Sequence, residues 1–208
     1  MSGEHPQKRV VTVNGSYRSG GFTDQMLDVM ESVLRERGMA VDRIVLRDTP
    51  IEFCTNCRTC GQQQGEATGR CIHDDGMRQL IDRLESADGF VFASPTNFTT
   101  VTALFKRFLE RLAVYGYWPW RTPAPTYRKA ETKAAVCITS CAAPSLMGRL
   151  MYDTLGVLKQ AARCVGAKVV GTLMIGLIAA EEHPRLGKGD TKRAKAATEK
   201  LIAALERS

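Results

Sequence analysis

Residues 9–23 read Arg9-Val-Val-Thr-Val-Asn-Gly-Ser-Tyr-Arg-Ser-Gly-Gly-Phe-Thr23. The first six residues form a short apolar run closed by Asn14-Gly15, which predicts a buried strand. The glycine-rich loop that follows ends at Thr23, which is expected to cap a helix over residues 24–37, and Gly38 is expected to end that helix. A strand, a loop and a helix in this order indicate the first βα unit of a parallel sheet.

The same alternation continues along the chain. Four further apolar strands are expected at residues 41–46, 88–94, 133–139 and 168–175. Helices are expected at residues 74–84, 101–112, 148–164 and 188–207. Five short strands that alternate with helices predict a parallel sheet with helices on both faces. We expect one domain over residues 1–208, with its core at about 9–175 and a C-terminal helix at 188–206.

Composition favours a cytoplasmic protein that binds anionic ligands. The 208 residues are 44% hydrophobic and 25% charged, which is ordinary for a globular protein. No apolar run approaches a membrane span, and the polar residues 1–8 do not resemble a signal peptide. Seven clustered cysteines suit a reducing compartment. The net charge of +7 suits nucleotides, whereas the dispersed lysines and arginines do not predict nucleic-acid binding.

Ligands of such sheets bind beyond the carboxyl ends of the strands. In the loop after the first strand, glycines free backbone amides, hydroxyls come from Ser16, Ser19 and Thr23, and Arg18 adds positive charge. Together with a helix N-terminus, these groups predict an anion site. The loop lacks the lysine of a P-loop and the pattern of a dinucleotide-binding loop. A glycine-rich turn before a capped helix is the structural alternative.

The loop after the third strand offers a different set of contacts. Pro95 stiffens it, Thr96 and Asn97 provide hydrogen bonds, and Phe98 can cover a planar ligand. An ordinary turn at a strand end has similar residues. Farther along, the aromatic stretch at residues 115–120 is expected either to cover a ligand or to lie at a subunit interface.

Four cysteines gather after the second predicted strand. Two residues separate Cys54 from Cys57 and Cys57 from Cys60, and Cys71 follows after ten more residues. Thiolates at two-residue spacing are typical of iron–sulfur ligation, and four sulfurs also suit a closed zinc site. Alternatively, the thiols bind nothing, or form a Cys54–Cys57 or Cys57–Cys60 disulfide. The long spacer before Cys71 weakens the cluster interpretation, so all three stay open.

Several motifs together resemble one known family. Their order is Gly15-Ser16-x-Arg18 with Thr23, the cysteine run, Asp74-Asp75 with Met77, and Ala87-Asp88-Gly89 leading to Ser94-Pro95-Thr96. This order is similar to that of the flavodoxin-like NAD(P)H-dependent FMN reductases, near their iron–sulfur flavoprotein branch. The similarity covers about residues 9–175. It implies a flavodoxin-like, doubly wound α/β fold with five parallel strands in the order 2-1-3-4-5.

The resemblance also implies a function. Such a protein transfers hydride from NADH or NADPH to FMN, and electrons then pass to a quinone, flavin, aromatic or metal acceptor, or to a protein partner. The rival function is that of a flavodoxin-like electron carrier or redox sensor, although such carriers tend to be acidic. Members are usually homodimers or homotetramers. Because the flavin itself performs the chemistry, no side chain is named as catalytic.

The binding residues that the resemblance implies fall into four groups. The FMN phosphate is expected at Ser16, Arg18, Phe22 and Thr23. The ribityl chain and ring are expected at Ser94, Pro95, Thr96, Asn97 and Phe98, and the third side of the site at Thr139, Ser140, Cys141 and Ala142. An iron–sulfur cluster, if the chain has one, is expected at Cys54, Cys57, Cys60 and Cys71.

Overall fold

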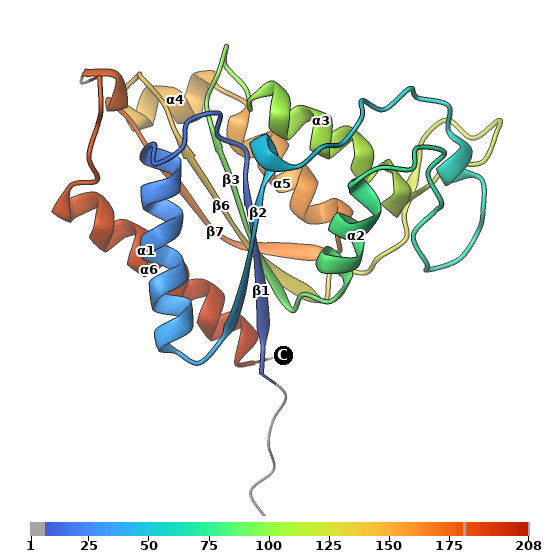
Figure 1. Ribbon diagram of the computed structural model, residues 1–208, viewed down its shortest axis with the longest axis horizontal. Coiled ribbons are helices and arrows are strands. Elements are labelled where there is room, and N and C mark those ends of the chain that lie inside the picture. The colour runs from blue at the N-terminus through green and yellow to red at the C-terminus, as the bar shows by residue number, and fades with distance from the viewer. Residues whose placement is uncertain (1–6, 181, 208) are drawn as a thin grey trace, which may run out of the picture.

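The computed structural model describes residues 7–180 and 182–207. Most of the polar N-terminal stretch, on which the expectation of no signal peptide depends, therefore lies outside the described residues. Figure 1 shows a central sheet whose strands all run in the same direction. Its order is β2-β1-β3-β6-β7, which confirms the predicted order 2-1-3-4-5. The strands are β1 (Arg9–Asn14), β2 (Ala40–Val45), β3 (Gly89–Pro95), β6 (Lys133–Ser140) and β7 (Ala167–Ile175).

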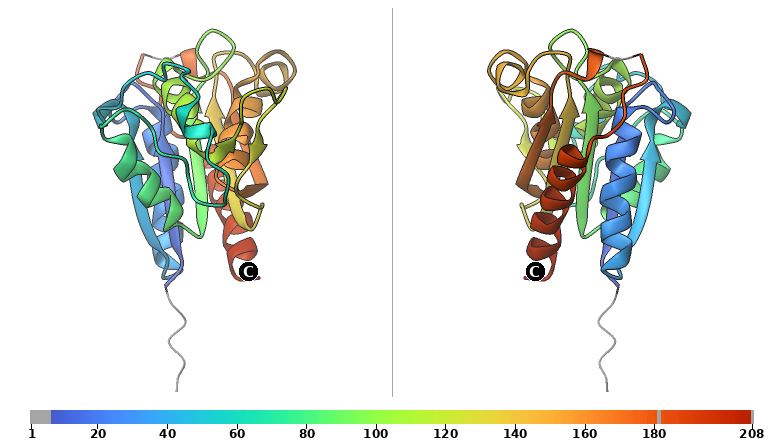
Figure 2. Two further views of the ribbon diagram at one scale, coloured as in Figure 1. Left: turned by 90° about the vertical axis from the view of Figure 1, so that its right-hand side faces the viewer. Right: turned by 90° about the vertical axis from the view of Figure 1, so that its left-hand side faces the viewer.

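Two core clusters flank the sheet, because successive strand residues point to opposite faces. In β1, Val10 packs with α1 (Phe22–Glu36) and α6 (Lys188–Leu205). Its neighbours Val11 and Val13 belong to the other cluster, with α2 (Met77–Glu85), α3 (Ala103–Arg111) and α5 (Thr154–Cys164). Figure 2 shows the two helical layers from both sides. No helix in the described part of the chain is long and apolar enough to cross a membrane.

Helices α1 and α2 do not begin where the sequence predicts. Helix α1 begins at Phe22, and Gly21 occupies the cap position, so Thr23 lies inside the first turn and does not cap it. Gly20 has a φ of 65°, a left-handed conformation that glycine adopts readily, and it lets the chain enter the helix early. Helix α2 begins at Met77, three residues beyond the predicted start at Asp74.

The helix expected at residues 148–164 is in fact two helices. Helix α4 (Ser145–Met151) ends where Tyr152 is extended, and α5 begins at Thr154. Between them, the Asp153 amide donates to the carbonyl of Thr99 at 3.0 Å. This hydrogen bond ties the α4–α5 junction to the loop after β3.

The aromatic stretch forms a small separate unit. After the 3-10 turn at Leu112–Tyr115, β4 (Gly116–Tyr117) pairs antiparallel with β5 (Thr126–Tyr127). The Trp118 amide donates to the carbonyl of Gly61 at 2.8 Å, which joins this hairpin to the cysteine segment. The stretch therefore packs on the cysteine segment and not over the carboxyl edge of the sheet.

Candidate functional site

A cleft of about 1110 Å³ opens at the carboxyl edge of the sheet, and we call it the edge cleft. Its walls come from the loops after β1, β3 and β6 and from the segment after β7. Ligands of doubly wound sheets bind at this edge. Most of the residues implied as FMN-binding line the cleft: Ser16, Arg18, Phe22, Thr23, Pro95, Thr96, Asn97, Ser140, Cys141 and Ala142.

Three implied residues do not line the edge cleft. Ser94 and Thr139 are buried at strand ends, where their hydroxyls bond to neighbouring protein groups. Phe98 is fully exposed. It and Thr99 have φ values of 44° and 70°, and they form a tight turn closed by hydrogen bonds between Asn97 and Thr100. The turn geometry holds the Phe98 side chain in solvent and not over the cleft.

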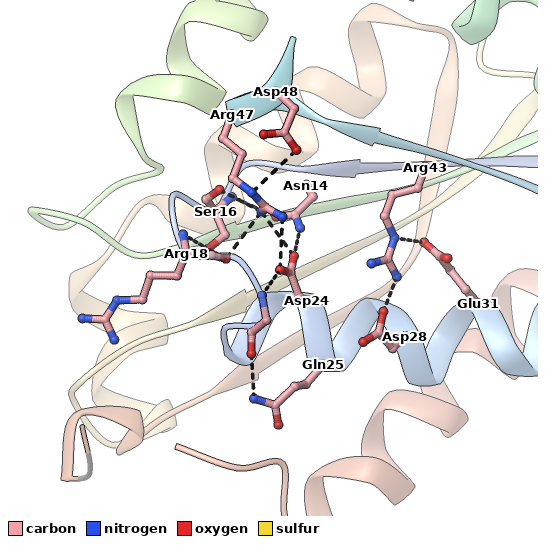
Figure 3. Close-up of polar contacts among 11 residues, drawn as sticks. Asn14, Ser16, Arg18, Asp24, Gln25, Asp28, Glu31, Arg43, Arg47 and Asp48 are labelled. Atoms are coloured by element: carbon pink, nitrogen blue, oxygen red, sulfur yellow. Dashed lines mark hydrogen bonds and ion pairs between the residues drawn. The ribbon is translucent and has the colours of Figure 1, made fainter. Parts of the chain in front are cut away.

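The glycine loop, residues 15–23, is shaped by a network of internal hydrogen bonds (Figure 3). The Ser16 amide donates to Asn14 Oδ1 at 2.8 Å, and the Gly20 amide donates to Asp24 Oδ2 at 2.6 Å. The Arg18 amide donates to Ser16 Oγ at 3.1 Å. Asn14 Nδ2 also donates to the Asp24 carboxylate. Alternate amides of the loop are thus turned toward the protein.

The remaining amides of the glycine loop have no partner. Within the described residues, the backbone N–H groups of Tyr17, Ser19, Gly21, Phe22 and Thr23 donate no hydrogen bond. All five residues line the edge cleft, the last two at the N-terminus of α1. Arg18 extends away from the network in Figure 3 and also lines the cleft. Free amides at a helix N-terminus beside a cation form a site for an anion.

Ser140 carries a second unsatisfied group at the cleft. The residue is 1% exposed, and its Oγ has no hydrogen-bond partner. A buried hydroxyl without a partner is unfavourable, so a polar atom of a ligand is a natural partner for it. Nearby, Thr96 Oγ1 contacts Thr154 Oγ1 at 2.8 Å and Thr139 Oγ1 at 3.3 Å, so this hydroxyl is already paired.

The sequence did not indicate the fourth wall of the cleft, which follows β7. Ile178, Ala179 and residues 182–185 line it. Gln25 holds this wall in place: its Nε2 donates to the Pro184 carbonyl at 3.1 Å, and its Oε1 accepts from the Leu186 amide at 3.0 Å. A glutamine on the first turn of a helix looks like an ordinary surface residue. Only the fold places it beside a segment 159 residues away.

A second pocket, of about 320 Å³, lies on the α3 and α5 side of the sheet, and we call it the cysteine pocket. Cys54, Cys57, Cys60 and Cys71 all line it, and Cys164 of α5 joins them. The long spacer therefore does fold back, and Cys71 lines the same pocket as the other three thiols. The Gly69 amide donates to the Val114 carbonyl at 2.8 Å and fixes this return.

A buried ion pair holds the two ends of the cysteine segment together. The side chain of Arg111 is 1% exposed, and its two terminal nitrogens donate to the Asp75 carboxylate at 2.6 and 3.0 Å. Arg111 also donates to the carbonyl of Glu52 at 2.8 Å and contacts Cys71 Sγ at 3.5 Å. Asp75 in turn accepts from the Glu52 amide at 2.7 Å. The beginning and the end of the segment thus meet at one pair of side chains.

The backbone of the cysteine segment is held in a specific conformation. Asn56 and Arg58 have φ values of 54° and 60°, and the Asn56 amide donates to Cys54 Sγ at 3.4 Å. The Arg58 guanidinium lies 3.9 Å from the ring centre of Trp118 and 4.5 Å from that of Trp120. Cation–π contacts of this kind stabilise the hairpin against the segment.

The thiols of the pocket differ in environment. Burial is the main cause that raises the pKa of the Cys60 thiol, and the neighbouring thiols, Cys71 first among them, raise it further. Hydrogen bonds from Thr59 lower the pKa of the exposed Cys57. None of the seven cysteines forms a disulfide. Over residues 7–180 and 182–207, no three Cys, His, Asp or Glu side chains converge to hold a metal ion. The four thiols surround one pocket and do not converge on a single point.

The fold and the edge cleft define the class of the protein: it is a flavodoxin-like α/β protein with a cleft at the carboxyl edge of its sheet. The comparisons with known proteins agree with this class. The profile of the NADPH-dependent FMN reductase family matches residues 8–180. The chain therefore belongs to this family.

Curated relatives are iron–sulfur flavoproteins. One from Archaeoglobus fulgidus is 33% identical over 111 residues, which are 53% of this chain and 48% of the relative. Another, from Methanosarcina thermophila, is 24% identical over 103 residues, 50% of this chain and 51% of the relative. The matched segments thus span about half the length of these relatives.

Solved structures share the fold at low sequence identity. A flavone reductase superposes with a TM-score of 0.65 at 18% identity and covers 95% of this chain and 63% of its own. An NADH:FMN oxidoreductase in its apo form gives 0.60 at 16% identity, with 95% and 90% covered. An archaeal flavodoxin gives 0.55 at 11% identity, with 95% and 99% covered.

Proposed function

We propose that the protein is an FMN-dependent oxidoreductase that takes hydride from NADH or NADPH and passes electrons to a quinone, flavin, aromatic or metal acceptor. The observation that carries this proposal is the set of unpaired donors at the edge cleft: the free amides of the glycine loop and the unpartnered Ser140 hydroxyl. Membership of the FMN reductase family supports it. FMN, when bound, supplies the chemistry of hydride acceptance and of onward electron transfer.

The chain's own residues bind and orient the cofactor in this proposal. The free amides and Arg18 would hold the phosphate, with the helix N-terminus adding favourable charge. Thr96 and Asn97 would contact the ribityl chain, and Ser140, Cys141 and Ala142 would face the ring from the end of β6. Ser94, Thr139 and Phe98 have no contact with the edge cleft and are not assigned to it. No side chain is assigned a proton transfer.

The test combines FMN binding with anaerobic reduction. We expect the protein to bind FMN, and NADH or NADPH to bleach the flavin's visible absorbance without oxygen. Arg18→Gln should weaken FMN binding by about tenfold, since one charge on a phosphate is worth about 1.4 kcal/mol. Arg207→Gln is the matched control, because Arg207 is exposed and does not line the cleft. A protein with no affinity for FMN would overturn the proposal.

A homodimer or homotetramer is part of the proposal. Helix α4, at the carboxyl edge, exposes four apolar side chains: Leu146 at 70%, Met147 at 49%, Leu150 at 81% and Met151 at 63%. Exposed apolar groups clustered in this way are typical of interaction surfaces. Light scattering should give a dimer or tetramer mass, and Leu146→Asp with Leu150→Asp should lower it. An unchanged mass for that double variant would exclude α4 from the interface.

The cysteine pocket supports a second cofactor, an iron–sulfur cluster on Cys54, Cys57, Cys60 and Cys71. Four thiols around one pocket are the donor set of such a cluster, and the curated relatives carry the name iron–sulfur flavoprotein. After anaerobic reconstitution we expect stoichiometric iron and sulfide in the wild type and loss of both in Cys71→Ala. Cys164→Ala is the matched control, since Cys164 lines the same pocket from α5. Equal iron in both variants would exclude Cys71 as a ligand.

The rival function is an electron carrier or redox sensor without small-molecule turnover. The relatives' name fits this function as well, and the cysteine pocket would then serve electron transfer alone. The two functions differ in one result. If FMN-loaded protein is not reduced by NADH or NADPH but accepts electrons from a chemical reductant, the carrier function holds and the reductase function fails.

A further inference from the structure

Arg47 and Asp24 form a largely buried ion pair directly beneath the glycine loop (Figure 3). Their side chains are 18% and 7% exposed, and Arg47 Nη2 lies 3.3 Å from Asp24 Oδ2. Arg47 Nη1 points at the carbonyls of Ser16 and Arg18, each at 3.4 Å. The pair joins the 3-10 turn after β2 (Leu46–Asp48) to the first turn of α1, with the loop between them.

The Arg47–Asp24 pair bonds to carbonyl and amide groups of the glycine loop that would otherwise be free to face the cleft. Asp24 accepts from the Gly20 amide at 2.6 Å and from Asn14, whose Oδ1 accepts from the Ser16 amide. Arg47 draws two loop carbonyls inward. With these carbonyls and amides engaged inside the protein, the free amides of the loop are the ones left to meet a ligand.

We propose that Arg47 and Asp24 are positioning residues that hold the glycine loop ready for the phosphate group, and so make the protein select FMN over riboflavin, the flavin that lacks the phosphate. This inference rests on the proposed function, because it assumes that the edge cleft binds a flavin. Neither residue lines the cleft, so both act through the loop.

The charge of Asp24 gives the inference a sharp consequence. A carboxylate beside an anion site repels a phosphate, so its electrostatic effect alone is unfavourable to FMN. A carboxylate is useful there only because it accepts hydrogen bonds from several donors at once. Electrostatics and positioning therefore predict opposite changes in FMN affinity when the charge of Asp24 is removed.

The variants are Asp24→Asn and Arg47→Lys, with dissociation constants for FMN and riboflavin measured by flavin fluorescence. Asp24→Asn has a single acceptor oxygen in place of two, and Arg47→Lys keeps the charge but loses the planar fork. Positioning predicts FMN binding weaker by about tenfold in each variant and riboflavin binding unchanged within about twofold. Electrostatics alone predicts tighter FMN binding for Asp24→Asn and no change for Arg47→Lys.

The matched control is Arg43→Lys. Arg43, on β2, also bridges to α1, with Nη2 2.7 Å from Asp28 and Nε 2.6 Å from Glu31, but it lies away from the loop (Figure 3). It should change thermal stability without changing the ratio of the FMN and riboflavin affinities. This control separates a loss of loop geometry from a general loss of stability.

Each outcome decides the inference. It is overturned if Asp24→Asn and Arg47→Lys keep the wild-type preference for FMN, or if Arg43→Lys loses that preference to the same extent. If Arg47→Lys does not fold, Asp24→Asn decides the inference alone. Weaker FMN binding supports it, and tighter FMN binding overturns it. If the wild type binds neither flavin, the proposed function fails and the inference fails with it. If the wild type binds FMN and riboflavin equally, the inference alone fails.

Discussion

Replacing Asp75 by Asn should destabilise the protein strongly, because it breaks the buried pair that holds the cysteine segment. Asp75 accepts from both terminal nitrogens of Arg111 and from the amides of Glu52 and Met77. The Asn side chain retains the shape but can satisfy fewer of these donors. Arg111, with a side chain only 1% exposed, would keep its charge without a countercharge.

The magnitude follows from the pKa of Asp75. Burial alone would raise it, but the hydrogen bonds from Arg111 and the two amides outweigh burial and lower the pKa from 3.8 to about 2. One pKa unit corresponds to about 1.4 kcal/mol, so the shift sets an upper bound of about 2.5 kcal/mol. The carboxylate keeps some contact with solvent, and screening reduces this to about 1–2 kcal/mol. The Arg111 side chain is buried in both proteins, so its desolvation adds no separate loss, and the expected total stays at about 1–2 kcal/mol.

The pH dependence has a definite sign. The folded pKa of Asp75 lies below its unfolded value, so the ionised carboxylate stabilises the folded state above about pH 4. This stabilisation should be lost as the pH falls from about 4 through about 2. The free energies of unfolding of the wild type and Asp75→Asn should therefore differ most at neutral pH and approach one another near pH 2.

The assay is urea unfolding of both proteins at several pH values, with Asp42→Asn as the control. Asp42 and Arg83 form a pair of similar geometry, with contacts of 2.9 and 2.6 Å, but with side chains 27% and 35% exposed. A pair at that exposure contributes about 1 kcal/mol or less. Equal losses for Asp75→Asn and Asp42→Asn at neutral pH, or a difference for Asp75→Asn that persists near pH 2, would refute the reasoning.

Three further predictions concern single positions. Ser140→Ala removes a buried, unpartnered hydroxyl, so the apo protein should be as stable as the wild type or more stable by about 1 kcal/mol. The variant should bind FMN about fivefold to tenfold more weakly, and thermal unfolding with and without FMN checks both results. Gly69→Ala places a Cβ 1.8 Å from the Cys60 carbonyl oxygen and should lower the free energy of unfolding by at least about 2 kcal/mol. Gly189→Ala has open space around it and should not lower it, and urea unfolding of both variants tests this contrast. Thr102→Ala removes the cap of α3 and a 2.6 Å hydrogen bond to the carbonyl of residue 15 and should cost about 1–3 kcal/mol; Thr102→Ser should recover most of it, and a fully stable alanine variant would contradict the cap.

The strands and the glycine loop could be predicted because local sequence encodes them, whereas the strand order was implied by the family resemblance. The apolar runs of β1 and β3 are short and are bounded by turn residues, and Gly15 lies where a side chain would meet Phe105 at 2.9 Å. Helix boundaries were less predictable. The start of α1 depends on the left-handed Gly20, and the break between α4 and α5 depends on a hydrogen bond to Thr99, which is distant in sequence.

The candidate site could be predicted in part. Residues at the ends of β1, β3 and β6 could be placed in the edge cleft, because parallel strands bring their carboxyl ends to one edge. The sequence could not show that Phe98 lies outside the edge cleft, because an aromatic residue in a loop looks the same in the sequence whether it is exposed or covers a ligand. The wall after β7 was missed because no motif marks it, and Gln25 holds it through contacts with residues 184 and 186.

The glycine loop and the cysteine segment are held in the same way. A largely buried pair of an arginine and an aspartate lies beneath each: Arg47 with Asp24 under the glycine loop, and Arg111 with Asp75 under the cysteine segment. The partners lie 23 and 36 residues apart, so in the sequence each one looks like a solvated charge. Each pair takes up backbone groups of its loop that would otherwise be free to bond elsewhere. Arg111 and Asp75, and not the spacing of the cysteines, therefore hold Cys71 in the same pocket as the other thiols.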